Sequence, residues 1–481
     1  MELKDKRNLS MLTDFYQLTM GNGYLENGFK DTEVIFEMFF RKVPDSGGFA
    51  IACGLQQVIE YLKNLNFTED DIEFLRGKAI FSEEFLNYLL NFKLDLDIYA
   101  VKEGTPIFPN EPILKARGPI IQAQLIETMV LLTMNHQSLI ATKAHRVKRA
   151  AKECSVMEFG SRRAQGYDAA MYGARAAYIG GVDSSANTLA DKAFGVKCVG
   201  TMAHSWIQLF DSEYEAFEAY AKVYPSNTVL LVDTYNTLKL GVPNAIKLAK
   251  EFLEPKGERL KGIRIDSGDL TYLSIQAREM LDNAGCNDCK VIVSNSLDEY
   301  TIRSLRHQGA RIDSFGVGER LVTAKSEPVF GGVYKLTAVE KNGVMVPRIK
   351  ISDNVEKITN PGDKELYRFY DLENNKALGD VLTINGEIID ETKPYELFDE
   401  LAIWKRKVLT DYRVEKLLTP IFIKGKCVYQ SPTVTEIKKY CAEQLETLWE
   451  ETKRFDNPQT YYVDLSQKLW DTKQELLRKG Y

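Results

Sequence analysis

Polar side chains that can bind anions or transfer protons follow a series of short apolar runs in the middle of the chain. The runs lie in VMEFGSRR, AAYIGGVDSS, KCVGTMAHS, TVLLVDTYNT, GIRIDSGDL, KVIVSNSLDE and RIDSFGVGER. The residues at their ends include Arg162, Ser185, Thr201, His204, Asp233, Arg264, Asp266, Asp269, Ser294, Gly316 and Gly318. Arginine matches carboxylate and phosphate oxygens, and aspartates such as Asp266 and Asp269 can hold ribose hydroxyls or Mg²⁺. The set indicates an anionic substrate that also carries a metal.

His204 is one of only four histidines in 481 residues, and it stands where an apolar run gives way to a polar turn. Imidazole changes its charge near neutral pH, and its ring nitrogens are nucleophilic. Taken alone, the stretch CVGTMAHSWIQ favours a hydrogen-bonded histidine near the core. Asp233 ends the next apolar run, and its carboxylate can accept a hydrogen bond from one ring nitrogen and leave the other free. The sequence therefore allows two roles for His204, as a proton relay and as a residue that is transiently phosphorylated.

The elements that must position these residues are strands alternating with helices. The seven runs recur at intervals of roughly 20–33 residues, and helical segments separate most of them. This pattern predicts a parallel sheet, and seven strands in succession favour an incomplete or closed βα barrel with its active site at the carboxyl ends of the strands. An open doubly wound sheet is the alternative, but no G-x-G-x-x-G opens the first unit. The glycines of FGVGERL suit close approach of the backbone to a phosphate.

The two ends of the chain predict an outer α/β domain around a central barrel at 151–335. In the N-terminal part, 1–150, we expect a helix within 9–28, a strand at 34–44, a small antiparallel sheet at 101–119 and a long helix over 120–152. Beyond 335 the alternation stops. LYRFYDL, the hairpin-like ALGDVLTINGEIID and a charged helix at 434–456 indicate that 336–481 returns to the outer domain.

Composition excludes several classes of protein. A net charge of −6 and an isoelectric point near 5.6 argue against a nucleic-acid-binding surface. The charged N-terminus lacks the apolar core of a signal peptide, and the run at 120–133 is too short and too polar to span a bilayer. Seven scattered cysteines predict reduced thiols in the cytoplasm. Cys286 and Cys289 form a C-x-x-C without a second pair, which favours a loop before a strand over a zinc or redox site.

Six motifs, in order along the chain, resemble those of the nicotinate phosphoribosyltransferases. They are TDFYQLTMGNGY, EFGSRRAQG, GTMAHS, IRIDSGDL, SNSLDE and GGVYKLTAV, and the resemblance covers nearly the whole chain. It implies an incomplete α/β barrel joined to an outer α/β domain, and a homodimer whose sites form where two subunits meet. It also implies that nicotinate reacts with phosphoribosyl pyrophosphate (PRPP) to give nicotinate mononucleotide and pyrophosphate. ATP hydrolysis would assist through a phosphohistidine, which GTMAHS places at His204, with Mg²⁺ as the cofactor.

The resemblance also implies roles for individual residues. Tyr16 and Phe159 are similar to two aromatic side chains that sandwich the pyridine ring, Tyr16 coming from the other subunit. Asp233 resembles the carboxylate that orients the histidine. The remaining expected contacts are Arg162, Thr201, Arg264 and Ser185 with nicotinate or the phosphoribosyl group, Asp14 and Asp266 with the sugar phosphate, Ser294, Thr323, Gly316 and Gly318 with the 5′-phosphate, and Lys357 with pyrophosphate or ATP. Glu319 and Arg320 depart from the small hydroxyl residues of related chains, so we expect Glu319 to point away from the phosphate.

Two other functions remain open from the sequence. A nicotinamide-using enzyme needs a group that accepts a hydrogen bond from the NH₂ of the amide, usually a carboxylate. Asp183 is the only acid in GGVDSSAN and so the only carboxylate in that stretch for this role. A noncatalytic barrel that binds phosphorylated metabolites needs no nucleophile, so His204, Asp233 and Asp266 together argue against it. We therefore expect an enzyme that prefers nicotinate.

Overall fold

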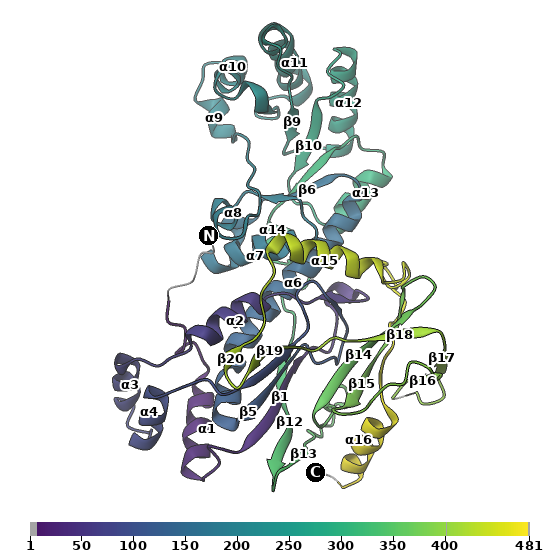
Figure 1. The fold of residues 1–481 in the computed structure, drawn as a ribbon. Coiled ribbons are helices and arrows are strands. Elements are labelled where there is room, and N and C mark those ends of the chain that lie inside the picture. Colours follow the sequence, from purple (N-terminus) through teal and green to yellow (C-terminus); the bar gives the residue numbers. More distant parts are fainter. Residues whose placement is uncertain (1–6, 401, 480–481) are drawn as a thin grey trace. The chain divides into compact units, whose positions relative to one another are not determined.

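The computed structural model describes residues 7–400 and 402–479, which form two compact units. One unit comprises 140–328, and the other combines 7–139 with 329–479, so both ends of the chain build the same unit. In Figure 1 the first unit runs from blue to green, and the second carries the purple and the green-to-yellow segments. Residues 1–6, on which the signal-peptide expectation partly rests, lie outside the described residues.

The unit at 140–328 is built on a six-stranded parallel sheet with the order β7-β6-β11-β10-β9-β8. The last strand in the sequence, β11, pairs with the first, β6, so the strand order wraps around on itself. The seventh predicted strand is wrong: in KCVG only Cys198 makes a single bridge, to Ser185, because β7 is too short to carry a longer partner. The strands are β6 (Ser155–Glu158), β7 (Ser184–Ser185), β8 (Val229–Leu231), β9 (Gly262–Ile265), β10 (Lys290–Ser294) and β11 (Ser314–Val317).

Helices connect these strands, as expected for parallel pairing, and confirm an α/β fold. Side chains at their first residues fix several of them: Asn187, Ser212 and Asp298 each accept a backbone hydrogen bond at a helix start. The helices are α7 (Tyr167–Ile179), α8 (Thr188–Phe194), α9 (His204–Gln208), α10 (Glu213–Val223), α11 (Val242–Leu248), α12 (Leu270–Asn283), α13 (Glu299–His307) and α14 (Glu319–Val322).

The second unit contains a seven-stranded antiparallel sheet with the order β13-β12-β1-β5-β3-β19-β20. Strands from opposite ends of the sequence are neighbours in it: β1 pairs with β12, and β3 pairs with β19. Its strands are β1 (Glu33–Phe39), β3 (Asp97–Ala100), β5 (Leu114–Pro119), β12 (Val333–Lys341), β13 (Val344–Pro347), β19 (Thr419–Ile423) and β20 (Lys426–Cys427).

A second sheet in this unit has four strands in the order β18-β14-β15-β21. The predicted hairpin within ALGDVLTINGEIID is wrong, because β15 pairs with the preceding β14 along nearly its whole length instead of with the residues that follow it. The strands are β14 (Lys364–Asp371), β15 (Ala377–Ile384), β18 (Tyr412–Lys416) and β21 (Val463–Leu465). Two short pairs complete the unit, β2 (Ala50–Ile51) with β4 (Pro106–Ile107) and β16 (Tyr395–Phe398) with β17 (Arg406–Leu409).

In the second unit, helices form in the three predicted segments, with shorter bounds, and in four further segments that were not predicted. The long helix expected over 120–152 divides into two, at 120–125 and 127–151. The helix expected over 434–456 ends at Glu446, where Lys376 Nζ donates to the Glu446 carbonyl oxygen (2.6 Å) and satisfies one of the last carbonyls. The helices are α1 (Phe15–Glu26), α2 (Leu55–Asn64), α3 (Glu69–Arg76), α4 (Glu83–Leu90), α5 (Ile120–Leu125), α15 (Val434–Glu446) and α16 (Gln467–Lys479). The helix α6 (Glu127–Ala151) begins in this unit and continues into the unit at 140–328. No helix in the described part of the chain combines the length and the apolarity needed to cross a membrane.

Asp464, buried on β21, makes the stability of the fold depend on pH. Its Oδ2 has no hydrogen-bond partner among the described residues, and burial, with the charges of Asp399 and Glu400, raises its pKa from 3.8 to about 7. A carboxyl whose pKa is raised by folding stabilises the protein when protonated, and this contribution is lost as the pH rises from about 4 to about 7.

The natural chain should therefore lose stability from pH 5 to pH 8, and Asp464→Asn should not. The free energy of unfolding of Asp464→Asn, measured relative to the natural chain, should rise by ~2 kcal/mol from pH 5 to pH 8. Urea denaturation at both pH values measures the difference. The exposed Asp353 provides the matched control, since Asp353→Asn should leave the pH dependence of unfolding unchanged. A difference between Asp464→Asn and the natural chain that stays the same at both pH values would contradict this account.

Candidate active site

The carboxyl ends of β6, β9, β10 and β11 bring the central polar residues together. Arg264 lies on β9 and Asp266 follows that strand, while Ser294 ends β10. Arg264 donates from Nε to Ser294 Oγ (3.1 Å) and from Nη1 to Thr201 Oγ1 (2.8 Å), and its Nη2 lies 3.5 Å from Asp266 Oδ1. Ser294 Oγ in turn donates to Asp266 Oδ1. Four residues from three segments that are far apart in the sequence thus form one network.

Asp233, His204 and Asp266 form a second cluster that adjoins this network. Asp233 is buried, and its Oδ2 accepts hydrogen bonds from the Asp266 backbone N–H (2.8 Å) and from Ser267 Oγ (2.6 Å). His204 Nε2 lies 4.0 Å from Asp233 Oδ1 and 3.9 Å from Asp266 Oδ2. These two distances exceed hydrogen-bond length, so the histidine is close to both carboxylates without being bonded to either.

The environment of His204 suits a group that must meet a substrate. Its side chain is 40% exposed, at the start of α9, and its Nδ1 lies 3.1 Å from Thr234 Oγ1. Asp233 Oδ1 is buried without a hydrogen-bond partner in the described part of the chain. An orphaned carboxylate oxygen is costly, and a hydrogen on Nε2 is the nearest donor that a small rotation of the imidazole would offer it. The predicted histidine–aspartate pairing is therefore within reach, with the ring open to solvent.

A cavity of about 290 Å³ opens at the same strand ends. Five cationic side chains line it, against the carboxylates of Asp266 and Glu319. Glu319 forms an ion pair with Lys325 (2.7 Å), and that hydrogen bond and charge lower the pKa of the Glu319 carboxyl. The cavity therefore has a net positive charge that suits an anionic ligand. The cationic residues are Arg162, Arg163, Arg264, Arg320 and Lys325.

Phe159 supplies the aromatic wall of this cavity. Its ring lies against Gly316 on β11, where an added Cβ would come within 2.6 Å of two ring carbons. The Arg264 guanidinium carbon lies 5.9 Å from the ring centroid, within the range of a cation–π contact. Gly316 is thus required by the ring of Phe159, a reason that differs from the phosphate approach expected from the sequence.

Three other predicted residues make hydrogen bonds within the protein, Ser185 with the neighbouring strand and Thr323 and Asp269 within their own segments. Ser185 is fully buried and donates from Oγ to Glu158 Oε2 (2.6 Å). Thr323 Oγ1 donates to the carbonyl oxygen of Glu319 one turn earlier (2.7 Å). Asp269 caps α12 by accepting from the Tyr272 N–H (3.0 Å). Among the described residues there is no group of three or more His, Cys, Asp or Glu side chains that could hold a metal ion.

The remaining predicted residues divide between the two units. Arg162 and Gly318 line the cavity in the unit at 140–328. Asp14, Tyr16 and Lys357 belong to the second unit: Asp14 is the residue before α1, Tyr16 is 45% exposed on that helix, and Lys357 ends a short 3-10 turn. Their part in the reaction therefore remains a prediction.

The structure adds site residues that the sequence did not single out for a role. Lys325 follows a turn rather than a strand, so the strand-end pattern could not find it. Ser296 lines the cavity beside Asn295, a residue that the strand-end pattern did indicate. Their φ angles of 50° and 97° are positive, a conformation that costs energy in non-glycine residues. Thr234 directly follows Asp233, and its position after β8 was the signal that could have identified it.

Glu158 holds the backbone next to Phe159. It is buried at the end of β6, where Oε1 accepts from the Gly160 N–H and Oε2 accepts from Ser185 Oγ. Burial raises the pKa of the Glu158 carboxyl, while the two hydrogen bonds oppose the rise. The contact with Ser185 joins β6 to β7, and the contact with Gly160 holds the backbone on the other side of Phe159.

Glu158→Gln should disturb this arrangement, because the amide keeps only one acceptor oxygen, so either the Gly160 N–H or the Ser185 hydroxyl hydrogen loses its acceptor. We expect kcat/KM for the aromatic substrate to fall about 10-fold, mainly through KM, at ~1.4 kcal/mol for each factor of ten. Steady-state kinetics measure the effect, and Glu153→Gln, on the exposed side before β6, is the control. A variant with unchanged KM would show that Glu158 does not position the ring.

Family models and curated relatives match nearly the whole chain. The family model described as the nicotinate phosphoribosyltransferase family matches residues 154–383, and the models of its N-terminal and C-terminal domains match 11–135 and 363–473. The nicotinate phosphoribosyltransferase of Bacillus subtilis (strain 168) is 44% identical over 474 residues, which cover 98% of this chain and 96% of the relative. That of Dictyostelium discoideum is 37% identical over 519 residues, covering 96% and 87%.

Solved structures show the same relationship. The crystal structure of human nicotinic acid phosphoribosyltransferase has a TM-score of 0.86 at 28% identity, covering 96% of this chain and 99% of the human chain. A nicotinate-nucleotide pyrophosphorylase from Pyrococcus furiosus shares the fold, with a TM-score of 0.69 at 24% identity. The sequence motifs, the strand-end site and these matches agree, and the chain belongs to the nicotinate phosphoribosyltransferase family.

Proposed function

We propose that the strand-end site of this chain joins nicotinate to PRPP, with release of pyrophosphate and nicotinate mononucleotide. The observation that carries the proposal is a positively charged cavity, walled by Phe159, beside an accessible His204 and two aspartates. Nicotinate, PRPP and pyrophosphate are all anions, and the pyridine ring needs a flat apolar partner. The product is a precursor of NAD, which places the reaction in NAD biosynthesis through the Preiss–Handler route.

In this proposal Phe159 stacks on the pyridine ring, while Arg264 and Arg162 hold anionic groups. The network from Thr201 through Arg264 to Ser294 fixes the guanidinium in one orientation, so little reorganisation is needed when substrate binds. Breaking the bond between C1′ and pyrophosphate develops positive charge on the ribose, and Asp266 lies where it can stabilise that charge. Nicotinate needs no general base, because its ring nitrogen already carries a lone pair.

ATP hydrolysis proceeds through His204 in this account. A small rotation of the imidazole would bring Nε2, with its hydrogen, from 4.0 Å to hydrogen-bond distance of Asp233 Oδ1 and release Nδ1 from Thr234 Oγ1. The Nδ1 lone pair then attacks the γ-phosphorus of ATP, and ADP leaves. Later attack by water on the phosphorus breaks the N–P bond and releases inorganic phosphate. Phosphorylation adds a charge of about −1.5 to −2 beside the cationic cavity, if the phosphohistidine behaves like other phosphorylated side chains. That charge can reorganise the site toward tighter substrate binding.

The residues present fit a magnesium ion that arrives with the substrates. Mg²⁺ is commonly held by one or two carboxylates together with substrate phosphates, and Asp266 presents a partly exposed carboxylate at the cavity. Asp269, the residue predicted from the sequence, is occupied as a helix cap. When bound to pyrophosphate, the ion neutralises charge on the leaving group. We therefore assign this role to Asp266 in preference to Asp269.

The architecture we propose is an incomplete βα barrel joined to an outer domain built from both ends of the chain. It is supported by the pairing of β11 with β6, which joins the last strand to the first and leaves the ring open between β7 and β8. The division into 140–328 and the two flanking segments supports the outer domain. The seven cysteines form no disulfide, in keeping with a reduced cytoplasmic location.

We also propose that the chain forms a homodimer with shared sites, in which Tyr16 of one subunit completes the ring sandwich of the other. The exposure of Phe15 and Tyr16 on α1 supports a partner there, and Asp14 and Lys357 would act from the same unit.

Mixing Tyr16→Ala with Arg264→Ala subunits should then restore about a quarter of natural activity. About half of the dimers are mixed after random exchange, and one of the two sites in each mixed dimer carries neither change. No recovery after subunit exchange, checked by mixed-dimer isolation, would show that Tyr16 acts within its own subunit.

Nicotinamide is the nearest alternative substrate. Asp183 is the acid that would accept a hydrogen bond from the amide of nicotinamide. Its carboxylate accepts instead from Lys148 Nζ (2.9 Å) and the Val156 N–H (2.8 Å) near the start of β6, away from the carboxyl ends of the strands where the site lies.

A turnover assay with PRPP, Mg²⁺ and ATP, comparing nicotinate, nicotinamide and quinolinate, tests the proposal. We expect strong preference for nicotinate. Comparable kcat/KM for nicotinamide would contradict it, and absence of turnover with all three would favour a noncatalytic phosphometabolite-binding protein.

A further inference from the structure

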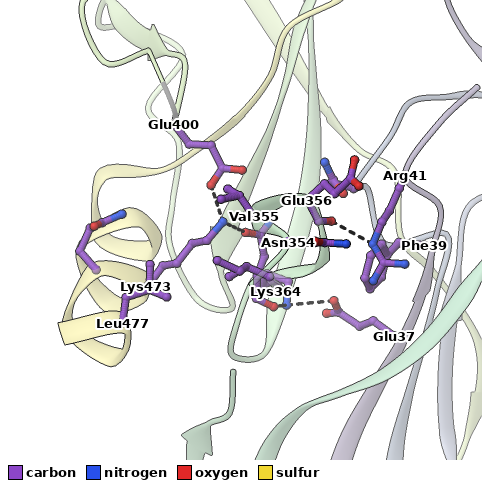
Figure 2. Close-up of a pocket in the computed structure, with 14 residues that line it drawn as sticks. Glu37, Phe39, Arg41, Asn354, Val355, Glu356, Lys364, Glu400, Lys473 and Leu477 are labelled. Atoms are coloured by element: carbon purple, nitrogen blue, oxygen red, sulfur yellow. Dashed lines mark hydrogen bonds and ion pairs between the residues drawn. The ribbon is translucent and has the colours of Figure 1, made fainter. Parts of the chain in front are cut away.

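A second and larger cavity, of about 530 Å³, lies within the unit that combines 7–139 with 329–479. Figure 2 shows its lining: Glu37 and Phe39 from β1, the segment around Val355, Lys364 at the start of β14, and Lys473 and Leu477 from α16. None of the residues assigned above to the reaction lines it. Both ends of the chain contribute to it, so a ligand here would contact β1 and the C-terminal helix at once.

The protein binds both lysines of this cavity, Lys364 through three acceptors and Lys473 through two. Lys364 is buried, and its Nζ donates to Glu37 Oε2 (2.9 Å) and to the carbonyl oxygens of Asn360 (2.8 Å) and Gly362 (3.1 Å). Lys473 Nζ donates to Glu400 Oε2 (2.6 Å) and Asn360 Oδ1 (2.7 Å). An ammonium group has three hydrogens, so Lys364 has none left for a ligand.

Glu37 retains an unused acceptor in the cavity. The residue is 2% exposed, and its Oε1 has no hydrogen-bond partner among the described residues, while Oε2 is bound to Lys364. A buried carboxylate oxygen without a donor is unfavourable, so a ligand with an N–H group would gain a charge-assisted hydrogen bond here. Glu356 and Glu400 also line the cavity, and with Glu37 they match the charges of Arg41, Lys364 and Lys473, so the lining has no net positive charge to attract an anion.

The other walls suit an aromatic or apolar body. Phe39 lies under the Arg41 guanidinium (5.4 Å to the ring centroid), and Val355, Ile358 and Leu477 add apolar surface. Apolar walls with a few fixed polar groups are typical of small-molecule sites. We propose that this cavity binds a small aromatic molecule with an amine or carboxamide nitrogen that donates to Glu37 Oε1, at a site separate from the catalytic cavity.

Benzylamine and benzoate form a matched pair of probes, because the first carries only donors and the second only acceptors. Saturation-transfer NMR and the melting temperature measure binding to the full chain, without any need for turnover. Benzylamine should bind and raise the melting temperature, since a ligand that binds only the folded state stabilises it. Leu477→Trp, which fills the cavity and leaves both ion pairs intact, should weaken this binding at least tenfold.

Leu476→Trp is the control, since it adds the same ring to α16 outside the cavity lining. Glu37→Gln should also weaken benzylamine at least tenfold, because its carbonyl oxygen stays with Lys364 and its NH₂ replaces the acceptor. Val355→Trp, at an exposed position on another wall, replaces Leu477→Trp if that variant does not fold. The proposal is overturned if benzylamine does not bind, if the filling variants leave its binding unchanged, or if benzoate binds equally well and is displaced by Leu477→Trp.

Discussion

Arg264→Ala should lower kcat/KM for nicotinate about 100- to 1,000-fold, equivalent to ~3–4 kcal/mol of transition-state stabilisation. Arg264 donates to Ser294 and Thr201 and faces the Phe159 ring, so its loss removes a cation from the cavity and the partner of two hydroxyl groups. Asp266 would also lose its nearest cation within the network. Steady-state kinetics with varied nicotinate and PRPP measure the loss.

A matched control separates this effect from a general loss of positive charge. Arg259 lies three residues before β9, where it forms ion pairs with Glu254 and Asp288 at the protein surface. Arg259→Ala should retain kcat/KM within a factor of two, because exposed ion pairs contribute little. A loss below tenfold in Arg264→Ala would show that this guanidinium is peripheral to the reaction.

His204→Ala should still form product but should lose all coupling of product formation to ATP hydrolysis. The imidazole is the nucleophile that we propose for the γ-phosphate, whereas the cavity and Phe159 remain in place without it. The variant should therefore show the same rate with and without ATP, and no nicotinate-dependent release of ADP. Simultaneous assay of ADP and nicotinate mononucleotide measures the ratio directly.

His307 provides the control for this substitution, since it lies exposed in the last turn of α13. His307→Ala should keep the natural ratio of ADP to product. ATP stimulation that persists in His204→Ala at the natural level would exclude the phosphohistidine.

Much of the fold was predictable because apolar runs and turns carry local signals. Five of the parallel strands, β6 and β8 to β11, coincide with apolar runs, whereas β7 consists of two serines and the apolar run before it mostly belongs to α7. Polar residues after the strands meet at one edge because parallel strands all point the same way. His204 and Asp233 were identified by this rule and lie 4.0 Å apart. The same rule predicted a strand at KCVG that the structure does not contain. A few apolar residues form a strand only when a neighbouring strand is long enough to pair with them, and the sequence of the segment does not show that.

Contacts that depend on tertiary pairing were not predictable. Asp269 carries the same side chain as Asp266 three residues earlier, yet it caps α12 while Asp266 joins Arg264 and Ser294. Glu158 looked like an ordinary strand residue, and only the neighbouring β7 reveals that its carboxylate binds Ser185. Lys325 reaches the cavity through an ion pair with Glu319, and no spacing in the sequence marks that contact.

The second cavity had no signal in the sequence for a similar reason. Glu37 and Lys364 are 327 positions apart, and each lies in a segment that reads as a plain strand. Their ion pair, and the acceptor left over on Glu37, arise only when β1 and the start of β14 approach each other. Sites built from both ends of a chain are visible only in the folded protein.

The most direct test of this account is the location of the phosphate after brief reaction with ATP labelled at the γ-position. Peptide mapping under alkaline conditions, which preserve phosphohistidine, should place an acid-labile label on His204. The label should disappear when nicotinate and PRPP are added and turnover begins. A label on another residue, or a natural chain that couples ATP hydrolysis to product without any label on His204, would contradict the central claim that this imidazole serves the strand-end site.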